Sequence, residues 1–372
     1  MPTLARSDQT VIGRWWWTVD RWTFGAILAL MLIGILLVLA ATPAVAVKHG
    51  LDNFYFVERH MIMLFPAAAL MFIVSLMPPK YIHTLALLLL LAFLPLLAAT
   101  LFIGVEIKGA TRWIQLFGLS IQPSEFIKPL FAVVGAWLFS RHCQRLGFPA
   151  LSVNIALYLL VMLCLVGQPD IGMTFLISMI WFTQFFLAGM PAMLAGAFPV
   201  IGIVGLVGAY NIFPHFASRF DRFISHSGDT YQTDKALEAF TNGGLFGTGP
   251  GAGTVKMHIP DAHADFIFAV AGEELGLIGA FAIISIFAFI ILRGMWRIRQ
   301  ETNLFIFLAV SGLLTAFGVQ TAINLSSTLN LIPAKGMTLP FISYGGSSLW
   351  AMALEMGMLL ALTRKRYGLA DM

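Results

Sequence analysis

Long apolar runs dominate this chain and constrain its architecture more than any other feature. Stretches of about 20 residues with few or no charged side chains recur between residues 24 and 363, and each is long enough to cross a hydrocarbon core of about 30 Å. Of the 372 residues, 59% are apolar and only 11% are charged, against about 25% charged in an ordinary soluble domain. The sequence therefore predicts an all-α, polytopic membrane protein with little chain left for a soluble domain.

The apolar runs divide into ten predicted membrane spans, which places both termini on the same side of the membrane. On that side lysine and arginine cluster beside the ends of spans, whereas on the other side they are scattered through long polar loops. The positive-inside rule therefore predicts cytoplasmic termini. We expect a cytoplasmic segment 1–23, a single transmembrane domain 24–363 and a cytoplasmic tail 364–372. The predicted spans are 24–41, 60–77, 82–104, 124–140, 151–167, 171–188, 191–213, 264–292, 303–327 and 347–363.

Three polar loops gather on the predicted outer side, at about 105–123, 214–263 and 328–346. The second is the longest and separates the seventh span from the eighth. Its glycine-rich part, 243–253, predicts a flexible lid, because glycine readily adopts positive φ. Since most polar residues gather in these loops, we expect any chemistry to take place at the outer face.

Several motifs lie in these loops and at the adjoining ends of spans. In order and spacing they resemble the SEDS family (shape, elongation, division and sporulation) over nearly the whole chain. The PAKGMT stretch at 333–338 resembles the division branch of that family rather than the elongation branch. The other motifs are KGATRW at 108–113, QPSEFIK at 122–128, QPDIG at 168–172, ADFIFAV at 264–270, GEELG at 272–276 and LPFISYGGSS at 339–348.

The resemblance implies an activity, a location and partners. It implies a peptidoglycan glycosyltransferase that polymerises lipid II at the outer face of the bacterial cytoplasmic (inner) membrane, at the division septum. It also implies a class B penicillin-binding protein as transpeptidase partner, together with other division proteins. The net charge of +4 lies mainly in short loops and termini and does not predict a nucleic-acid partner. No nucleotide-binding fingerprint is present, so a nucleotide-sugar donor is not expected.

Asp265 is the candidate catalytic residue, because polymerisation needs a base for the attacking hydroxyl group. It stands where a polar loop enters an apolar helix, and partial burial there should raise the pKa of its carboxyl group. If the helix begins at Pro260, Asp261 shares its face and raises that pKa further. The alternative is that both carboxylates only cap and solvate the helix entrance. The resemblance favours catalysis, since Asp265 matches the family's invariant aspartate, although Ala264 replaces the threonine that is common there.

Other acidic residues lie close to or within the apolar spans. Glu125 and Lys128 are three residues apart and are predicted to form an ion pair. That pair either has a purely structural role or lines the outer cavity and contacts substrate, and the resemblance favours the second role. Glu273, Glu274 and Glu355 either hold helices together or extend the cavity, and the sequence leaves both open.

The leaving pyrophosphate requires cations, and the two that lie within motifs are Arg112 and Lys335. Arginine suits bidentate contacts to phosphate and lysine supplies a point charge. We also predict that Ser343 and Tyr344, in the last motif, bind substrate. The alternative is that each of these cations is only a solvated charge on a loop. The outer cations are Lys108, Arg112, Arg219, Arg222, Lys256 and Lys335.

A metal site and two other functions remain as alternatives. His258, Asp261, His263 and Asp265 form a compact group, but the spacing is not typical of zinc ligands. We therefore predict no metal site and no certain cofactor, with a divalent cation left open. The two cysteines exclude a disulfide framework and a four-thiolate site. A lipid II flippase would need polar groups at mid-bilayer depth, and a non-catalytic division scaffold would not need Asp265.

Overall fold

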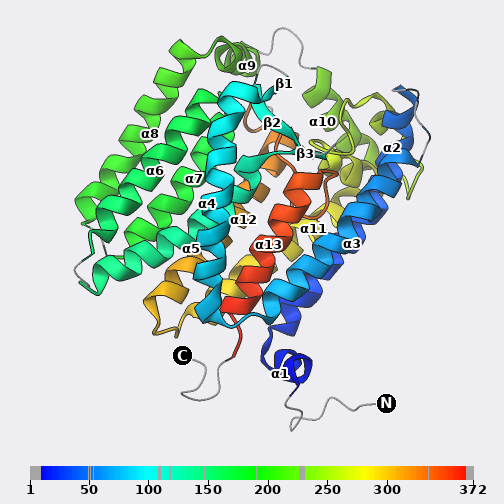
Figure 1. The fold of residues 1–372 in the computed structure, drawn as a ribbon. Coiled ribbons are helices and arrows are strands. Elements are labelled where there is room, and N and C mark those ends of the chain that lie inside the picture. The colour runs from blue at the N-terminus through cyan, green and yellow to red at the C-terminus, as the bar shows by residue number, and fades with distance from the viewer. Residues whose placement is uncertain are drawn as a thin grey trace.

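The computed structural model describes residues 10–48, 50, 52, 54–107, 110–116, 119–145, 148–189, 191–225, 231–333 and 335–365. Over these residues the chain forms a bundle of long helices with one small antiparallel sheet (Figure 1). The helices are α1 Val11–Thr18, α2 Arg21–Lys48, α3 Tyr55–Leu76, α4 Pro79–Ile103, α5 Pro123–Cys143, α6 Ala150–Gly167, α7 Ile171–Leu187, α8 Ala192–Ile212, α9 Pro214–Ser225, α10 Tyr231–Gly243, α11 Ile267–Ile298, α12 Leu304–Thr328 and α13 Gly346–Leu362. The strands are β1 Val105–Ile107, β2 Ala110–Leu116 and β3 Leu119–Ile121, and a 3₁₀ turn covers Val255–His258.

Each of the ten predicted spans coincides with a helix, which confirms the mainly helical fold class. Among the described residues, six helices are long and apolar enough to cross a membrane, namely α2, α3, α4, α6, α11 and α12, and α8 with α9 adds a seventh if that bent pair is one span. α7 and α13 have 17 residues each and fall just short in length. α5 has 21 residues but carries Glu125, Lys128 and Arg141. Length and composition thus support most of the predicted spans individually.

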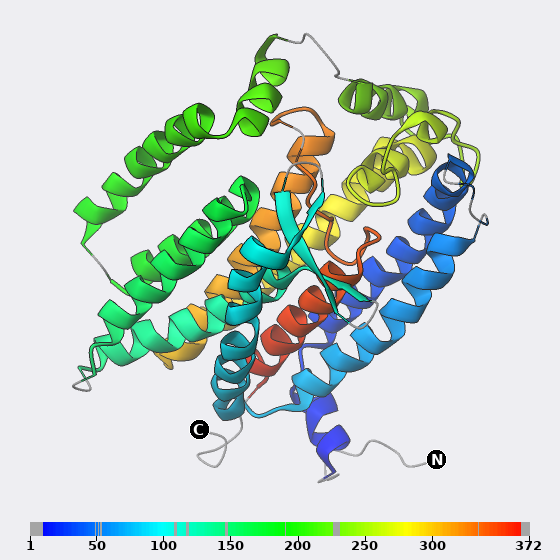
Figure 2. The same ribbon diagram turned by 45° about the horizontal axis from the view of Figure 1, so that its top comes forward.

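The two ends of the bundle differ in what they carry. The sheet, α9 and α10 lie at one end, and α1 lies at the other, together with the last turn of α13 (Figure 1). α12 packs on α5 and α7, and α13 packs on α3 and α5, so these helices form the centre. α8 lies at the edge of the bundle (Figure 2). Small residues allow close contact, as where Gly357 of α13 lies against the backbone of Met71 in α3.

The first predicted outer loop contains the sheet, which is an addition to the predicted all-α fold. β2 pairs with β1 and with β3, both antiparallel. The hydroxyl of Ser347, in the first turn of α13, donates to Ser120 O (3.2 Å) and accepts from Gln122 N (3.1 Å). Pro123 then starts α5, where its missing N–H costs nothing. The sheet therefore joins α4 to α5 and is fastened to α13.

α11 is broken at Gly276, whose φ of 67° and ψ of −172° are not helical. The break frees backbone groups, and the glycine-rich segment satisfies them. Leu277 N donates to Gly244 O (2.9 Å), and Thr248 N donates to Glu273 O (2.9 Å). Gly247, with a φ of 82°, lies directly against the backbone of α11 at Glu274. This part of the predicted flexible lid is therefore bonded into the break, as required of non-helical backbone in a membrane protein.

Candidate functional site

Asp265 lies at the end of the bundle that carries the sheet, in a turn that precedes α11. The helix begins at Ile267 and not at Pro260, and Asp261 has a positive φ of 53°. The prediction that Asp261 and Asp265 share a helical face is therefore wrong. The chain turns through residues 261–266 because their backbone groups bond to other segments instead of continuing a helix.

Two neighbouring segments hold this turn in place. Asn324 near the end of α12 donates from Nδ2 to Asp265 O (3.0 Å) and to Met337 O (2.6 Å). Ser343 Oγ donates to Ala264 O (2.6 Å), and Tyr344 N donates to His263 O (2.9 Å). Asp265 is thus fixed between α12 and the 335–345 loop, two segments that follow it far along the chain.

Ser343 and Tyr344, which are predicted to bind substrate, contact the turn that carries Asp265. Ser343 is buried, and its hydroxyl also accepts a hydrogen bond from Leu339 N (2.8 Å). The Tyr344 ring packs against His263 with centroids 5.2 Å apart and against Phe56 at 5.3 Å. Burial raises the pKa of the Tyr344 hydroxyl, although Arg59 opposes this. Both residues therefore position the backbone around Asp265.

The Asp265 carboxylate faces the backbone of Gly336. A Cβ atom at Gly336 would come within 2.9 Å of Asp265 Oδ2, so only glycine leaves the carboxylate this much room. Lys335 precedes Gly336 and brings a cation to the neighbourhood of the candidate base. The sequence places these two residues 70 and 71 positions after Asp265, and only the fold brings Gly336 and Asp265 together.

Lys335 and Arg112 meet on a buried carboxylate, Asp170. Lys335 Nζ lies 3.1 Å from Asp170 Oδ1, and Arg112 Nε lies 3.2 Å from Asp170 Oδ2. The Lys335 side chain also lies against Gly172. We call Arg112, Asp170 and Lys335 the cation cluster. Asp170 was not predicted as a site residue, although the QPDIG motif at 168–172 contains it.

The electrostatics of the cation cluster leave one net positive charge. Burial alone would raise the pKa of Asp170, but Lys335 and Arg112 outweigh burial and lower it. Burial lowers the pKa of Lys335, Asp170 opposes this, and Arg112 and Arg219 lower it further. Two cations thus face one ionised carboxylate, which suits a further anion.

Glu125 and Lys128 form the predicted ion pair, with 2.7 Å between Oε2 and Nζ. Both side chains are buried between α5 and the helices beside it, and Lys128 Nζ also donates to Gln320 Oε1 on α12. Gln320 Nε2 donates in turn to Thr338 O (3.0 Å), in the segment after Lys335. The pairing is confirmed, and the pair connects the centre of the bundle to the loop beside Asp265.

The deeper glutamates have separate roles. Glu273 accepts hydrogen bonds from the backbone N–H groups of Thr254, Val255 and Lys256 at 2.7 to 2.8 Å, and the Lys256 ammonium pairs with Glu274. These two acids therefore fasten the long loop to α11, and Lys256 is occupied by this pairing. Glu355 in α13 is fully buried, and neither carboxylate oxygen has a hydrogen-bond partner among the described residues.

The remaining candidates are not brought together. In the described parts of the chain, no three His, Cys, Asp or Glu side chains are arranged to hold a metal ion, and this holds for the group around His258 and His263. Lys108 lies outside the described residues, as does the side chain of Arg222. Arg219 is in α9 and acts electrostatically on Lys335.

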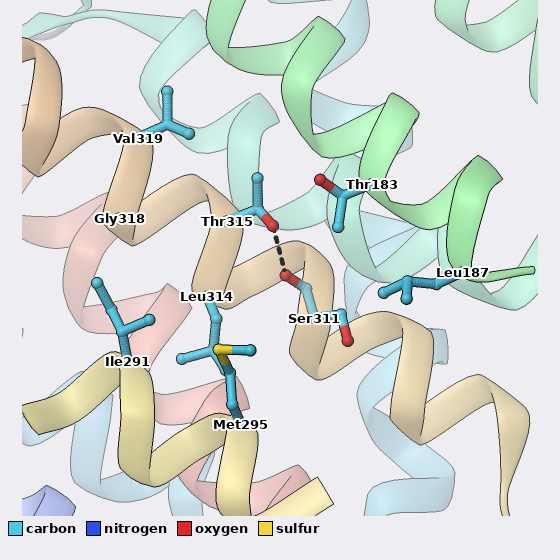
Figure 3. A pocket seen from close by; sticks show the side chains of 9 residues that line it. All are labelled: Thr183, Leu187, Ile291, Met295, Ser311, Leu314, Thr315, Gly318 and Val319. Carbon is cyan, nitrogen blue, oxygen red and sulfur yellow. Dashed lines mark hydrogen bonds between the residues drawn. The ribbon is translucent and has the colours of Figure 1, made fainter. Parts of the chain in front are cut away.

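One cavity of about 300 Å³ lies between α7, α11 and α12, away from Asp265. Its lining is mainly apolar, with Leu187 of α7, Met295 of α11 and Leu314 of α12 among its walls (Figure 3). The hydroxyls of Ser311 and Thr315 donate to carbonyls of their own helix (2.8 Å each). The cavity therefore offers no group suited to acid, base or phosphate chemistry.

Comparison with known proteins gives close matches over almost the whole chain. A protein of Caulobacter vibrioides named "Probable peptidoglycan glycosyltransferase FtsW" is 43% identical over 366 residues, covering 98% of this chain and 94% of the relative. A protein of the same name from Coxiella burnetii is 33% identical over 363 residues, covering 93% of this chain and 96% of the relative.

Solved structures share the fold. A chain from a structure titled "Structural coordination of polymerization and crosslinking by a peptidoglycan synthase complex" matches with a TM-score of 0.74 and 25% identity, covering 93% of this chain and 97% of the other. The rod shape determining protein RodA of Thermus thermophilus matches with a TM-score of 0.68 and 26% identity, covering 93% of this chain and 96% of RodA. The family model described as "Cell cycle protein" matches residues 21–368. The chain therefore belongs to the FtsW, RodA and SpoVE family of cell cycle proteins, as its resemblance to the SEDS family predicts.

Proposed function

We propose that this chain is a peptidoglycan glycosyltransferase that polymerises lipid II at the outer face of the cytoplasmic membrane during cell division. The observation that carries the proposal is the position of the Asp265 carboxylate against Gly336, the residue that directly follows Lys335 of the cation cluster. Polymerisation needs a proton acceptor and a cationic site for pyrophosphate within reach of one sugar. The names of the FtsW relatives support the same reaction.

In the proposed reaction, Asp265 accepts the proton of the 4-hydroxyl group of one sugar as that oxygen attacks the anomeric carbon of another. A carbon–oxygen bond forms to the incoming sugar, and the bond to the lipid pyrophosphate breaks. Lys335 and Arg112 stabilise the negative charge that develops on the leaving pyrophosphate. Asp170 keeps both cations in place before substrate arrives, and the Glu125–Lys128 pair supports the adjoining loop through Gln320.

The proposal is tested by glycan synthesis from lipid II with purified protein. Asp265→Asn should lower the rate by about 10²–10⁴, the usual contribution of a positioned base, while lipid II binding stays nearly unchanged. Asp234→Asn, an exposed carboxylate on α10, serves as the matched control and should keep its activity. An Asp265→Asn rate above about a tenth of the wild-type rate would exclude this residue as the base. The same assay with and without EDTA decides whether a divalent cation assists.

We extend the proposal to a transpeptidase partner, a class B penicillin-binding protein. The structural neighbour comes from a complex that couples polymerisation to crosslinking, and the described helices contain no separate domain that could crosslink strands. Copurification in mild detergent with a single-span penicillin-binding protein is the expected result. Absence of any such neighbour after crosslinking in dividing cells would contradict it, as would an even distribution of the protein around the cell instead of at the septum.

A lipid II flippase is the second candidate function, and one observation favours it. Glu125, Lys128 and Glu355 are buried ionisable groups within the bundle, as a pathway for a polar headgroup would need. A flippase would carry lipid II across vesicles and make no glycan. Glycan formation by the wild-type protein, lost in Asp265→Asn, decides for the polymerase.

A further inference from the structure

A second cavity, of about 320 Å³, lies at the end of the bundle opposite Asp265. It is enclosed by the first turns of α4 and α12 and the last turns of α5. Its lining is polar and aromatic, unlike that of the cavity between α7, α11 and α12. The residues that line it include Lys80, His83, Trp137, Ser140, Arg141 and Asn303.

Two cations face this cavity without a fixed counter-charge. Within the described chain, neither Lys80 nor Arg141 forms an ion pair with an acidic residue. Arg141 lies over the Trp137 ring (5.6 Å from the guanidinium carbon to the centroid), and the His83 ring stacks on Trp137 at 6.0 Å. Glu301, three residues before the start of α12, accepts a hydrogen bond from Asn303 N (3.0 Å). The cavity therefore carries net positive charge on a rigid aromatic wall.

A hydroxyl donor and two helix N-termini complete the cavity. Ser140 is only 4% exposed, and its hydroxyl has no hydrogen-bond partner among the described residues although it lines the cavity. α4 and α12, of 25 residues each, both begin here, with Pro79, which has no N–H, and with Leu304. Asn303 caps α12 by accepting a hydrogen bond from Ile306 N (3.4 Å), so the two helices contribute the positive ends of their dipoles and not a set of free N–H groups. The Ser140 hydroxyl beside two cations and two helix N-termini suits a phosphate group.

We propose that this cavity binds the phosphate group of an anionic phospholipid headgroup. The cavity lies at the ends of membrane-spanning helices, where headgroups are found, and basic pockets between spans recognise such lipids. Tyr81, next to Lys80, is 52% exposed and presents an apolar ring beside the cavity, as residues at a membrane interface do. A free phosphate ion has the same charge but no acyl chains to lie along α4.

The experiment measures binding of phosphatidylglycerol to the purified full-length protein by native mass spectrometry. Lys80→Gln together with Arg141→Gln should weaken binding of one lipid molecule by about 30-fold, and each single change by about 5-fold. Arg145→Gln with Arg299→Gln is the matched control, because it removes two exposed charges that do not line the cavity. All four positions are exposed, so thermal unfolding should change little.

Two further arms identify the source of the phosphate group. Phosphatidylcholine should not occupy the site with comparable affinity, and millimolar inorganic phosphate should not displace phosphatidylglycerol. Equal binding by the wild-type protein and the Lys80/Arg141 double variant would overturn the proposal. Displacement by inorganic phosphate would overturn the assignment to a lipid.

Discussion

Asp170→Asn is the substitution that best tests how the cation cluster is built. Asparagine keeps the size of the side chain and can still accept the 3.3 Å hydrogen bond from Met173 N that caps α7. It removes the charge that faces both Lys335 and Arg112. The change therefore isolates electrostatics from helix capping and packing.

The structure sets the expected size of the effect. The Asp170 side chain is 4% exposed, and those of Lys335 and Arg112 are 17% and 21% exposed. Removing one partner of a buried ion pair costs about 3–5 kcal/mol. Because the two cations keep some contact with solvent, we expect Asp170→Asn to lower the free energy of unfolding by about 2–3 kcal/mol. Lys335→Gln should lower the free energy of unfolding by less, since Asp170 then still pairs with Arg112.

A double-mutant cycle measures the coupling directly. Asp170→Asn with Lys335→Gln should be clearly more stable than the sum of the single changes predicts, with a coupling energy of about 1–2 kcal/mol. Lys235 and Glu238 on α10 are the control pair. Lys235 Nζ lies 2.5 Å from Glu238 Oε2, but the two side chains are 28% and 51% exposed. That pair should show no resolvable coupling, because solvent screens it.

The assay is denaturant unfolding in detergent micelles at pH 7, followed by tryptophan fluorescence and circular dichroism. Glycan synthesis by the same variants reports whether the cluster also serves catalysis. An Asp170→Asn loss below about 1 kcal/mol would refute the reasoning. So would single effects that simply add, because a buried carboxylate shared by two cations cannot act independently of them.

Burial would raise the pKa of Asp20, but hydrogen bonds from two arginines hold it at about 2, below the ordinary 3.8. The free energy of unfolding should therefore fall by about 2 kcal/mol as the pH drops from about 4 to about 2. Asp20→Asn should abolish that pH dependence in acid-unfolding curves. Gly247→Ala should lower the free energy of unfolding by about 3 kcal/mol, because the added Cβ meets backbone atoms. Gly244→Ala, also at positive φ but in open space, should lower it by about 1 kcal/mol. Equal losses in the two variants would contradict the close approach of Gly247 to α11. In a background without the native cysteines, Glu238→Cys should react with an impermeant thiol reagent in intact spheroplasts and Gln300→Cys should not, and the reverse pattern would contradict the proposed orientation.

The membrane-spanning architecture follows from the amino-acid sequence alone. A helix rises about 1.5 Å per residue, and a bilayer requires all its backbone hydrogen bonds to be internal, so each apolar run had one stable form. The Glu125–Lys128 pair was equally predictable, because neighbours on a helix surface are fixed by spacing alone. Asp265 as a catalytic candidate came from the family resemblance together with its place at a helix entrance.

The surroundings of Asp265, in contrast, depend on how distant segments pack. The start of α11 at Ile267 depends on hydrogen bonds from Asn324 and Ser343 to the preceding turn, and no local pattern at Pro260 contains that information. Asp170 meets Lys335 only because the turn before α7 packs beside the loop after α12. Local periodicity specifies helices, but hydrogen bonds and ion pairs between distant segments specify a site, since they form only once the helices have packed.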